Sequence, residues 1–403
     1  MNARIPRGFK DILPAEAALR ESICNKVQQV FSLWGYQPVE TPTLEVMEVL
    51  QTAGYSGKAA FRLFDSDGEL LVMRPDVTLP IARLVGTRIG VPAAGEALRL
   101  RYKQSVFREE RAYEAQARAV TQLGVECIGL AGLAGDVEAL LLLAESLDAT
   151  GLKTDRHDIS SQGSYTIALC TVGVLQAILA ACVSAGFTDL NWQWAVLAAW
   201  HRSDLVAVDA LMDKPSIDQQ YGSAISTLAR LQGGLEAIDS CRALLPTQQA
   251  ATADSSNGPA LSADLARCSE ELDRLEQTFR LVQELRPDVG WLVDFSLMGS
   301  FDYYTGLMFS AFAPGSGYPL AGGGRYDQTL SQFGAPAPAT GFALNLERIV
   351  SAILSEGAAV SQSTTGSAPR RIVADPQDPA RAFREANEFR TRGQVAAITE
   401  EEA

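Results

Sequence analysis

Histidine and cysteine, the side chains that most often hold zinc, are scarce in this sequence. Only two of the 403 residues are histidine, and the six cysteines include no Cys-x-x-Cys pair. A zinc site needs about four such ligands, usually in closely spaced pairs, so we expect no metal, and no other cofactor is indicated. Scattered cysteines are more often small buried apolar residues. We expect this of Cys24, Cys127, Cys170, Cys182, Cys241 and Cys268.

Long hydrophobic runs and positive charge are also in short supply. No uncharged apolar stretch reaches the roughly 18 residues that a membrane span needs, and the start, MNARIPRGFKDILP, lacks the apolar core of a signal peptide. The sequence therefore predicts a cytoplasmic protein without a membrane partner. Lys and Arg number 34 against 48 Asp and Glu, which gives a net charge of −14 and a pI near 4.8. Because binding a polyanion needs many cationic contacts, we expect no nucleic-acid partner.

Apolar periodicity predicts the elements of the first part of the chain. Apolar residues recur at helical spacing from Leu19 to Phe31, which predicts a helix over 14–33 that ends before Gly35. The alternating and apolar stretches that predict strands are 36–41, 70–73, 98–107 and 119–128, and a second helix is predicted at 135–147. These elements do not repeat as strand–helix–strand units. The pattern favours an α+β fold with a mixed, mainly antiparallel sheet flanked by helices.

The middle of the chain has a different character. Alanine- and leucine-rich helical patterns dominate it, which predicts a helical insertion. Strand-like patterns then return, followed by a helical pattern over 346–354. The predicted organisation is a first core part at 1–171, the insertion at 172–286, a second core part at 287–357, and a linker with a small C-terminal element at 358–403.

Two stretches could present polar side chains to a ligand. MRPDVTLPIAR, at 73–83, leads from a strand into a helix and places Asp76 and Thr78 at the helix start, where they could cap the helix or face a ligand. In the strand that follows 107, Gln122 and Glu126 fall on the same face. They could form the floor of a polar site or a stripe that faces solvent. The residues by themselves leave both alternatives open in each case.

Two further stretches combine tyrosine with glycine. MGSFDYYTGLMFSAF, at 298–312, predicts a strand over 303–312, and a strand would send Tyr303 and Tyr304 to opposite faces. One phenol would then lie in the core and the other would be exposed or would face a ligand. AGGGRYD, at 321–327, predicts a glycine-rich loop. It lacks the lysine and hydroxyl of a phosphate-binding loop, so its glycines indicate only a close approach of the backbone.

Taken in order, these motifs resemble those of the histidyl-tRNA synthetases, which are class II enzymes. GFKDILP at 8–14 is similar to the family's GTKDxxP signature, and GYQPVETPTLE at 35–45 to its first motif. FREE at 107–110 resembles FRxE in the second motif. Later in the chain DYYTG, AGGGRYD and LER resemble parts of RGLDYYTG, AGGRYD and GLER, and the similarity covers 7–166 and 291–350. The resemblance implies a class II synthetase-like core.

The resemblance also implies a histidine-binding pocket. Three side chains, including an aspartate where the family has glutamate, would hold the α-ammonium group: Asp76, Thr78 and Gln122. Those implied around the imidazole are Glu126, Tyr303, Tyr304 and Tyr326, and Arg108 is counted with the histidine-binding set. Imidazole offers one donor and one acceptor, or two donors when protonated, and a carboxylate with phenols can satisfy either form.

Two arginines, Arg108 and Arg348, match positions that the family uses for ATP phosphates. They could keep a residual nucleotide contact, or they could be paired with Glu110 and Glu347 for structural reasons. The sequence leaves the two interpretations even. For Arg348 we therefore predict only a possible residual contact with a nucleotide.

Departures from the family pattern point away from catalysis. Gly299 stands where the resemblance implies the arginine that stabilises charge during adenylate formation, and loss of one such donor typically costs about 10²-fold or more in rate. The family's Gly-Arg pair in the second motif is replaced at 115–116, and Asn345 replaces a glycine of the third motif. We also expect no anticodon-binding domain, because about fifty residues follow Ile349. No catalytic residue is predicted.

An amino-acid pocket without the catalytic parts resembles the regulatory subunits of ATP phosphoribosyltransferase in histidine biosynthesis. The resemblance implies a partner, the short-form catalytic subunit, and L-histidine as effector. It also implies a homodimer through the first motif, near Pro42, inside a larger hetero-oligomer. Two alternatives remain open: a shortened histidyl-tRNA synthetase or related amino-acid-activating ligase, in which Arg325 would supply the missing cation, and a synthetase-derived RNA-binding protein. The acidic charge disfavours the last.

Overall fold

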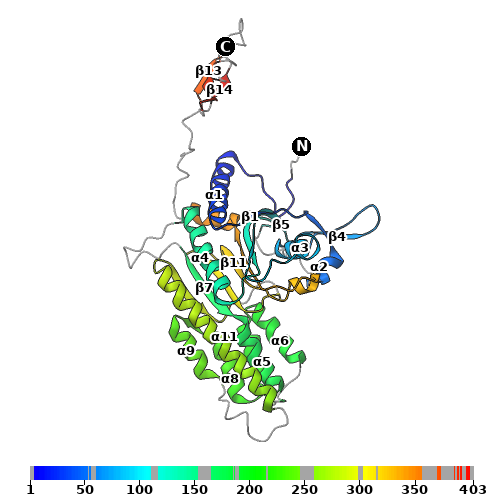
Figure 1. Cartoon of the computed structure of the whole chain (residues 1–403), viewed down its shortest axis with the longest axis vertical. Helices are drawn as coiled ribbons and strands as arrows, with labels where there is room; N and C mark the ends of the chain where they lie inside the picture. The colour runs from blue at the N-terminus through cyan, green and yellow to red at the C-terminus, as the bar shows by residue number, and fades with distance from the viewer. Residues whose placement is uncertain are drawn as a thin grey trace.

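A nine-stranded mixed sheet organises the computed structural model (Figure 1). The order is β1-β5-β6-β12-β11-β10-β7-β9-β8, and of these neighbours only β1–β5 and β7–β9 run parallel. The strands are β1 Gln37–Pro38, β5 Leu98–Phe107, β6 Ala119–Ile128, β7 Thr166–Thr171, β8 Gln232–Gly233, β9 Gly290–Asp294, β10 Leu307–Phe312, β11 Ala321–Arg325 and β12 Ala339–Asn345. The predicted α+β class with a mainly antiparallel sheet is confirmed.

The structure describes most of the chain. The described residues are 4–52, 54–55, 60–109, 117–152, 165–184, 186, 190–214, 217–245, 258–297, 303–314, 316–355, 370–373, 385, 388–389, 391–392 and 396–399. Gly299 and positions 115–116, on which part of the sequence argument depends, lie outside this set. Within it, no helix is long and apolar enough to span a membrane.

Three helices cover one face of the sheet: α1 Pro14–Leu33, α4 Gly132–Thr150 and α12 Leu346–Ser355. The apolar stripe of α1 that the sequence predicts is buried there, including Ile23, Val27 and Phe31. Phe31 makes an edge contact with Phe342 of β12, with ring centroids 5.9 Å apart. The sheet and these helices therefore share one large hydrophobic core.

The opposite face of β5, β6 and β12 carries smaller elements that leave space for a ligand. They are α3 Thr78–Leu84, the π-helical turn η1 Val85–Ile89 and the 3₁₀ turn η2 Leu330–Phe333. A second apolar cluster, including Val77, Ile81 and Leu330, joins them to Tyr102 and Tyr326. Beside it lies a three-stranded sheet of β2 Leu44–Val46, β4 Leu70–Met73 and β3 Arg62–Phe64, with α2 Met47–Thr52 packed against it.

A group of helices separates β7 from β9 in the sequence and forms the lower part of Figure 1. They are α5 Val172–Ser184, α6 Leu190–His201, α7 Leu205–Met212, α8 Gln219–Leu228, α9 Leu235–Leu244 and α11 Gly258–Leu285. All six cysteines are buried, as predicted. Near the C-terminus β13 Arg370–Val373 and β14 Ala396–Thr399 form a separate parallel pair.

Three predicted elements differ from the observed ones. The strand predicted at 303–312 begins only at Leu307, the strand predicted at 36–41 is reduced to Gln37–Pro38, and the predicted glycine-rich loop is strand β11. Glycine is required in β11 by close packing. A Cβ on Gly324 would lie 2.6 Å from the Leu307 carbonyl oxygen and 2.8 Å from the Tyr304 ring. The glycines thus let a tyrosine lie directly on the sheet.

Candidate functional site: a two-ended pocket on the sheet

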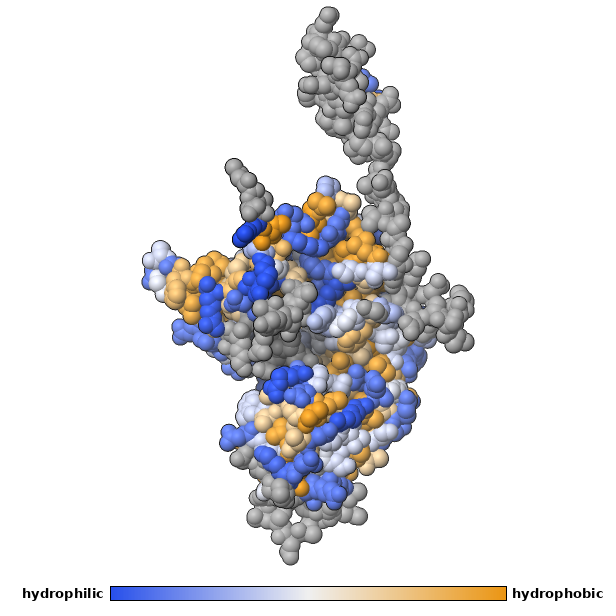
Figure 2. Space-filling view, turned by 180° about the vertical axis from the view of Figure 1, so that it is seen from behind, coloured by the Kyte–Doolittle hydropathy of each residue, from blue (hydrophilic) through white to orange (hydrophobic). Residues whose placement is uncertain are grey.

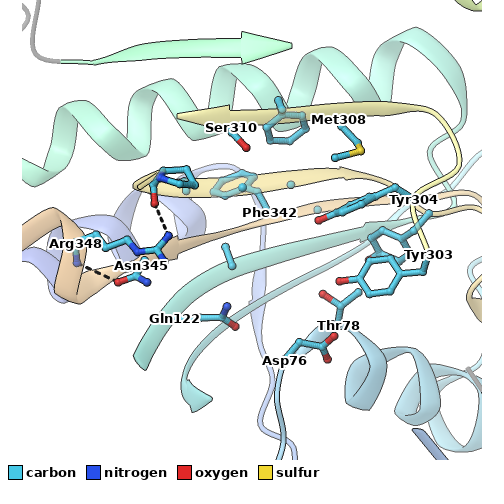
Figure 3. A pocket seen from close by; sticks show the side chains of 18 of the residues that line it. Asp76, Thr78, Gln122, Tyr303, Tyr304, Met308, Ser310, Phe342, Asn345 and Arg348 are labelled. Carbon is cyan, nitrogen blue, oxygen red and sulfur yellow. Dashed lines mark hydrogen bonds between the residues drawn. The ribbon is translucent and has the colours of Figure 1, made fainter. Parts of the chain in front are cut away.

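A cavity of about 350 Å³ opens over β6, β12, β11 and β10, on the face opposite α1 and α4 (Figure 3). Two tyrosines, Asp76 and Thr78 lie at one end, and Asn345 and Arg348 lie at the other, with Gln122 between them. Of the implied histidine-binding residues, those on the cavity wall are Asp76, Thr78, Arg108, Gln122, Tyr303, Tyr304 and Tyr326. The structure therefore brings together residues from five separate stretches of the chain.

Asp76 is placed by the turn between β4 and α3. Its Oδ1 accepts a hydrogen bond from the backbone nitrogen of Leu79 at 3.2 Å, which satisfies one exposed N–H at the start of the helix. Its Oδ2 is buried and has no hydrogen-bond partner among the described residues. Burial raises the pKa of Asp76 to about 6, against the opposing effects of the Leu79 hydrogen bond and the Arg108 charge. One oxygen caps the helix and the other remains for a ligand.

Glu126 lies directly behind the cavity wall rather than on it. Thr78 Oγ1 donates to its Oε1 at 2.8 Å, and the Tyr326 hydroxyl donates to its Oε2. The residue is 1% exposed. Burial raises the pKa of Glu126 to about 8, although both hydrogen bonds act in the opposite direction. Glu126 thus orients Thr78 and Tyr326, two residues that do line the cavity.

Tyr303, Tyr304 and Tyr326 form one packed aromatic group. The ring centroid of Tyr303 lies 5.0 Å from that of Tyr304 and 5.9 Å from that of Tyr326. Burial raises the pKa of Tyr303 and of Tyr326 well above the usual value for a phenol, so both hydroxyls stay protonated at neutral pH. Because Tyr303 and Tyr304 precede β10 instead of belonging to it, the alternation of a strand does not apply. Both line the pocket, contrary to the expectation that they would face opposite ways.

Tyr102 and Met308 are among the pocket residues that were not found from the sequence. Tyr102 of β5 is 2% exposed and lines the cavity beside Thr78. It reaches that position because its neighbour across the strand pair is Gly124, where a Cβ would overlap the Tyr102 ring. Met308 adds an apolar surface next to Tyr304. Only the pairing of β5 with β6 reveals the role of Tyr102, so no local sequence signal marks it.

The other end of the pocket is built by the start of α12. Asn345 Oδ1 accepts from the backbone nitrogen of Arg348 at 3.0 Å and so caps the helix. The Arg348 side chain donates to the carbonyl oxygen of Pro319 at 2.9 Å and lies over the Tyr318 ring, 5.1 Å from its centroid. Glu347 pairs with Arg20 at 2.6 Å. The ion pair between Arg348 and Glu347 that the sequence allowed is therefore replaced by these contacts.

Arg108 and Arg325 are both held by protein groups. Arg108 Nε donates to the carbonyl oxygen of Pro75 at 3.0 Å, which places its positive charge beside Asp76. Arg325 is 1% exposed and donates to Asp136 at 2.7 Å, to Asp327 at 3.0 Å and to the Gly132 carbonyl at 3.0 Å. These bonds fix the Arg325 guanidinium in place, where it links β11 to α4.

The chemistry of the acidic end favours a ligand that donates hydrogen bonds or carries positive charge. Two buried carboxyl groups of raised pKa face several phenols, and among the residues described Arg108 is the cation whose charge acts on Asp76. A cationic or donor-rich group entering this end would stabilise the charged carboxylates. No group of three or more potential metal ligands occurs among the described residues. The acidic end thus suits a small organic amine.

Comparisons with known proteins show the family of the chain. A family model described as histidyl-tRNA synthetase matches residues 8–349. The ATP phosphoribosyltransferase regulatory subunit of Moorella thermoacetica is 36% identical to this chain, over 98% of the chain and 92% of the relative. The chain belongs to this family of regulatory subunits. A second such regulatory subunit, from Desulfitobacterium hafniense, is 30% identical over 100% of this chain and 94% of its own length.

Solved structures place the regulatory-subunit family in the synthetase fold. A crystal structure from Bacillus halodurans, described as an ATP phosphoribosyltransferase regulatory subunit/histidyl-tRNA synthetase, has a TM-score of 0.75 at 27% identity, covering 100% of this chain and 93% of the other. The histidyl-tRNA synthetase of Nostoc has a TM-score of 0.74 at 18% identity and covers 100% and 87%. At 18% identity, the comparison with the Nostoc enzyme shows the fold alone. The class II synthetase-like core predicted from the motifs is confirmed.

Proposed function

We propose that this regulatory subunit binds the short-form catalytic subunit of ATP phosphoribosyltransferase, raises its activity, and carries feedback inhibition by L-histidine. The observation that supports the effector role is the enclosed acidic and phenolic end of the pocket, in a chain related to proteins named as regulatory subunits. Histidine can shift the complex only by the difference in its affinity for the two states, commonly about 1–3 kcal/mol. The pocket supplies a place for that differential binding.

In this proposal the α-ammonium group of histidine binds at Asp76, Thr78 and Gln122. The unpartnered Oδ2 of Asp76 is the acceptor that an ammonium group would satisfy. The imidazole lies among the three tyrosines, where Glu126 fixes the hydroxyls of Thr78 and Tyr326 from behind. Arg108 would stay on the Pro75 carbonyl beside Asp76 and meet the carboxylate of the ligand.

The same proposal makes the chain non-catalytic. Arg325, the cation that could have replaced the missing arginine, is bound by Asp136 and Asp327. Asn345 and Arg348 line the end of the pocket where a nucleotide would lie, and Arg348 donates there to the Pro319 carbonyl oxygen. Because Gly299 offers no positive charge, adenylate formation would lose a main source of charge stabilisation.

The homodimer is proposed to form through the first motif, near Pro42, and the three-stranded sheet that follows it. Its strands expose large apolar side chains: Leu44 is 40% exposed, Leu63 37% and Phe64 71%. In Figure 2 hydrophobic surface gathers over this projecting part of the molecule. Exposed apolar groups of this kind favour a protein–protein interface. A cytoplasmic location, without nucleic acid as partner, completes the proposal.

The function is tested by mixing the chain with a short-form catalytic subunit. Phosphoribosyltransferase turnover should rise on addition of the chain and fall again when L-histidine is added, and the two chains should co-elute. Unchanged turnover together with separate elution would contradict the proposal.

The location of the effector is tested by Tyr304→Phe, which removes one buried hydroxyl of the pocket. Loss of one hydrogen bond costs about 0.5–1.5 kcal/mol, so calorimetry should show histidine affinity reduced about two- to tenfold. Tyr165→Phe removes a comparably buried hydroxyl that bonds Asp148 outside the pocket, and it should leave the affinity unaltered. Equal affinities for Tyr304→Phe and wild type would place the effector elsewhere.

The alternative of a shortened amino-acid-activating ligase is kept because one solved relative at 29% identity, from Alicyclobacillus acidocaldarius, is described as a histidine–tRNA ligase subunit. Histidine-dependent exchange of pyrophosphate into ATP by the purified chain would establish that alternative. Absence of exchange, with activation of the catalytic subunit, would exclude it.

A further inference from the structure

Arg74, which lies just before the turn that carries Asp76, is a buried arginine outside the amino-acid pocket. It is 6% exposed, and its guanidinium donates to three backbone carbonyl oxygens. Nε donates to Ser105 of β5 at 2.8 Å, and Nη1 donates to Thr41 at 2.7 Å and to Pro42 at 3.1 Å. The side chain therefore ties the first motif to β5.

The backbone of Arg74 joins the same two segments. Its N–H donates to the carbonyl oxygen of Thr43 at 2.9 Å, and its own carbonyl oxygen accepts from the backbone nitrogen of Phe107 at 3.0 Å. Main chain and side chain are thus both held. Arg74 is fixed in one position between the first motif and the end of β5.

Little conformational freedom remains between Arg74 and Asp76. Pro75 separates them, and a proline ring fixes its own φ and confines the residue before it to extended conformations. The Pro75 carbonyl oxygen is also held, because it accepts from Arg108 Nε at 3.0 Å. The position of Arg74 therefore determines where the Asp76 carboxylate lies at the acidic end of the pocket (Figure 3).

Arg74 carries a charge that a gain in stability does not explain. It forms no ion pair among the described residues, since the nearby Glu45 is paired with Arg83 at 2.9 Å. Burial lowers the pKa of Arg74, against the opposing charges of Glu45 and Glu40. A charge removed from water costs free energy, whereas the rigid fork of an arginine can hold several acceptors in one geometry. These contacts indicate a role in positioning.

We propose that Arg74 is a positioning residue of the amino-acid pocket, which holds the turn between β4 and α3 so that the Asp76 carboxylate can meet the ammonium group of the effector. The inference rests on the proposed function. It names a residue outside the cavity on which recognition of one end of the ligand depends. Loss of the Arg74 contacts would displace the Asp76 carboxylate and leave the tyrosines around the imidazole in place.

Recognition of the ammonium group can be measured apart from the rest of the ligand. Imidazolepropionate is histidine without its α-ammonium group, so the ratio of the two affinities reports on the Asp76 end of the pocket. Calorimetry on the wild-type chain should show that histidine binds about tenfold tighter or more, because a hydrogen bond to a charged group is lost with the ammonium.

Arg74→Lys keeps the charge but lacks the fork, so it cannot hold both segments at once. Histidine affinity should fall about tenfold and imidazolepropionate affinity should stay within about twofold, so that their ratio approaches one. A merely structural role of Arg74 would weaken both ligands alike.

Pro75→Ala is a second variant, which decides the question if Arg74→Lys does not fold. It leaves the Arg74 side chain in place but gives the turn more freedom, which the bound state must then restrict. Histidine affinity should fall about two- to fivefold, with imidazolepropionate again unaffected.

Arg101→Lys is the matched control. Arg101 is a half-buried residue of β5 whose Nε donates to the Tyr36 carbonyl oxygen at 3.1 Å, and it does not line the cavity. The substitution should leave both affinities within about twofold of wild type.

Two results would overturn the inference and leave the proposed function standing. One is a wild-type affinity ratio in Arg74→Lys and Pro75→Ala, and the other is an equal weakening of both ligands. Equal affinities of the wild-type chain for histidine and imidazolepropionate would instead contradict the ammonium site of the proposed function, and this inference with it.

Discussion

The two carboxyl groups at the acidic end determine how the pocket responds to pH. Glu126 and Asp76 are 1% and 3% exposed, and burial is the main cause of the raised pKa of each. An ionised carboxylate in such a position reduces the stability of the folded chain, because its charge has lost its hydration. A ligand that donates to this end offsets part of that loss.

Glu126 gives a prediction about stability and pH. Its pKa is raised in the folded chain from the ordinary 4.5 to about 8, so the folded state binds the extra proton between these values. The contribution of Glu126 to the free energy of unfolding should therefore be fully present below pH 4.5 and decrease as the pH rises through 8. Glu126→Gln removes the titration, so its stability should decrease less between pH 5.5 and 8.5.

Urea unfolding of both chains at several pH values measures this difference. Asp209→Asn is a suitable control, because Asp209 is exposed, pairs with Arg230, and has a lowered pKa. It should keep the pH slope of the wild type over this range. Equal slopes for wild type and Glu126→Gln would contradict the raised pKa.

For single residues, the sequence predicted which side chains line the pocket better than it predicted how those side chains are oriented. The capping alternative for Asp76 is observed, because its Oδ1 caps α3, and its Oδ2 is buried without a partner among the described residues, so that its contact with a ligand stays a prediction. The period of two misplaced Tyr303 and Tyr304, since it applies only inside a strand and they precede β10. Tyr102 could not be found at all, because its access depends on Gly124 in the neighbouring strand.

The start of α12 shows how one element limits the pocket. Asn345 ends β12 and its side chain caps the helix, so the residue that fills space at this end also stabilises the element that carries Arg348. A glycine here would leave more room but would lose the side-chain acceptor. This gives a structural reason for asparagine at a position where the synthetase pattern has glycine.

Asn345→Ala should lower the free energy of unfolding by about 1 kcal/mol, because the cap is lost, whereas Asn345→Gly should lower it by only a few tenths of a kcal/mol. Chemical denaturation of the two variants beside wild type measures both values. Asp218→Ala removes a similar cap from α8, so it measures how much a cap outside the pocket contributes to the free energy of unfolding. Equal losses for alanine and glycine would show that Asn345 does not act as a cap.

Long elements were predictable and short ones were not. The helix Pro14–Leu33 and the strands Leu98–Phe107 and Ala119–Ile128 have the predicted bounds, because each carries a long apolar pattern. The strands β2, β3 and β8 have two or three residues each and exist only through their pairing with other strands. Strand β11 was taken for a loop because its glycines reflect close packing, such as that of Gly324 against Leu307 and Tyr304, rather than chain reversal.

At the scale of the molecule, the exposed apolar residues of the three-stranded sheet give a prediction about assembly. Phe64→Asp places a charge where the proposed dimer buries an aromatic side chain, and loss of such an anchor typically costs about 2 kcal/mol or more. The dimer dissociation constant should rise at least about tenfold in sedimentation experiments.

Trp194→Asp is the matched control, because Trp194 is similarly exposed, at 68%, but lies on α6. It should leave the dimer unchanged. A Phe64→Asp chain that sediments as wild type would exclude this sheet from the interface.

The domain division at 1–171, 172–286, 287–357 and 358–403 stays a proposal. In its favour, β7 ends at Thr171 and the helices α5 to α11 occupy the chain before β9 begins at Gly290. The fold and the family could be predicted from the sequence because the motifs that indicate them are local. The pocket geometry could not be predicted, since it combines side chains from separate strands.

The pairing of β7 with β9 has one more consequence. These strands are adjacent and parallel, so the chain must return along the sheet between them, and a single helix is enough for such a return. The 28 residues of α11 span about 42 Å and already pack on α4, α5, β7 and β9. The remaining helices are then an elaboration of an ordinary crossover. They also bury apolar side chains against α5 and α11, so the crossover and its elaboration share one core.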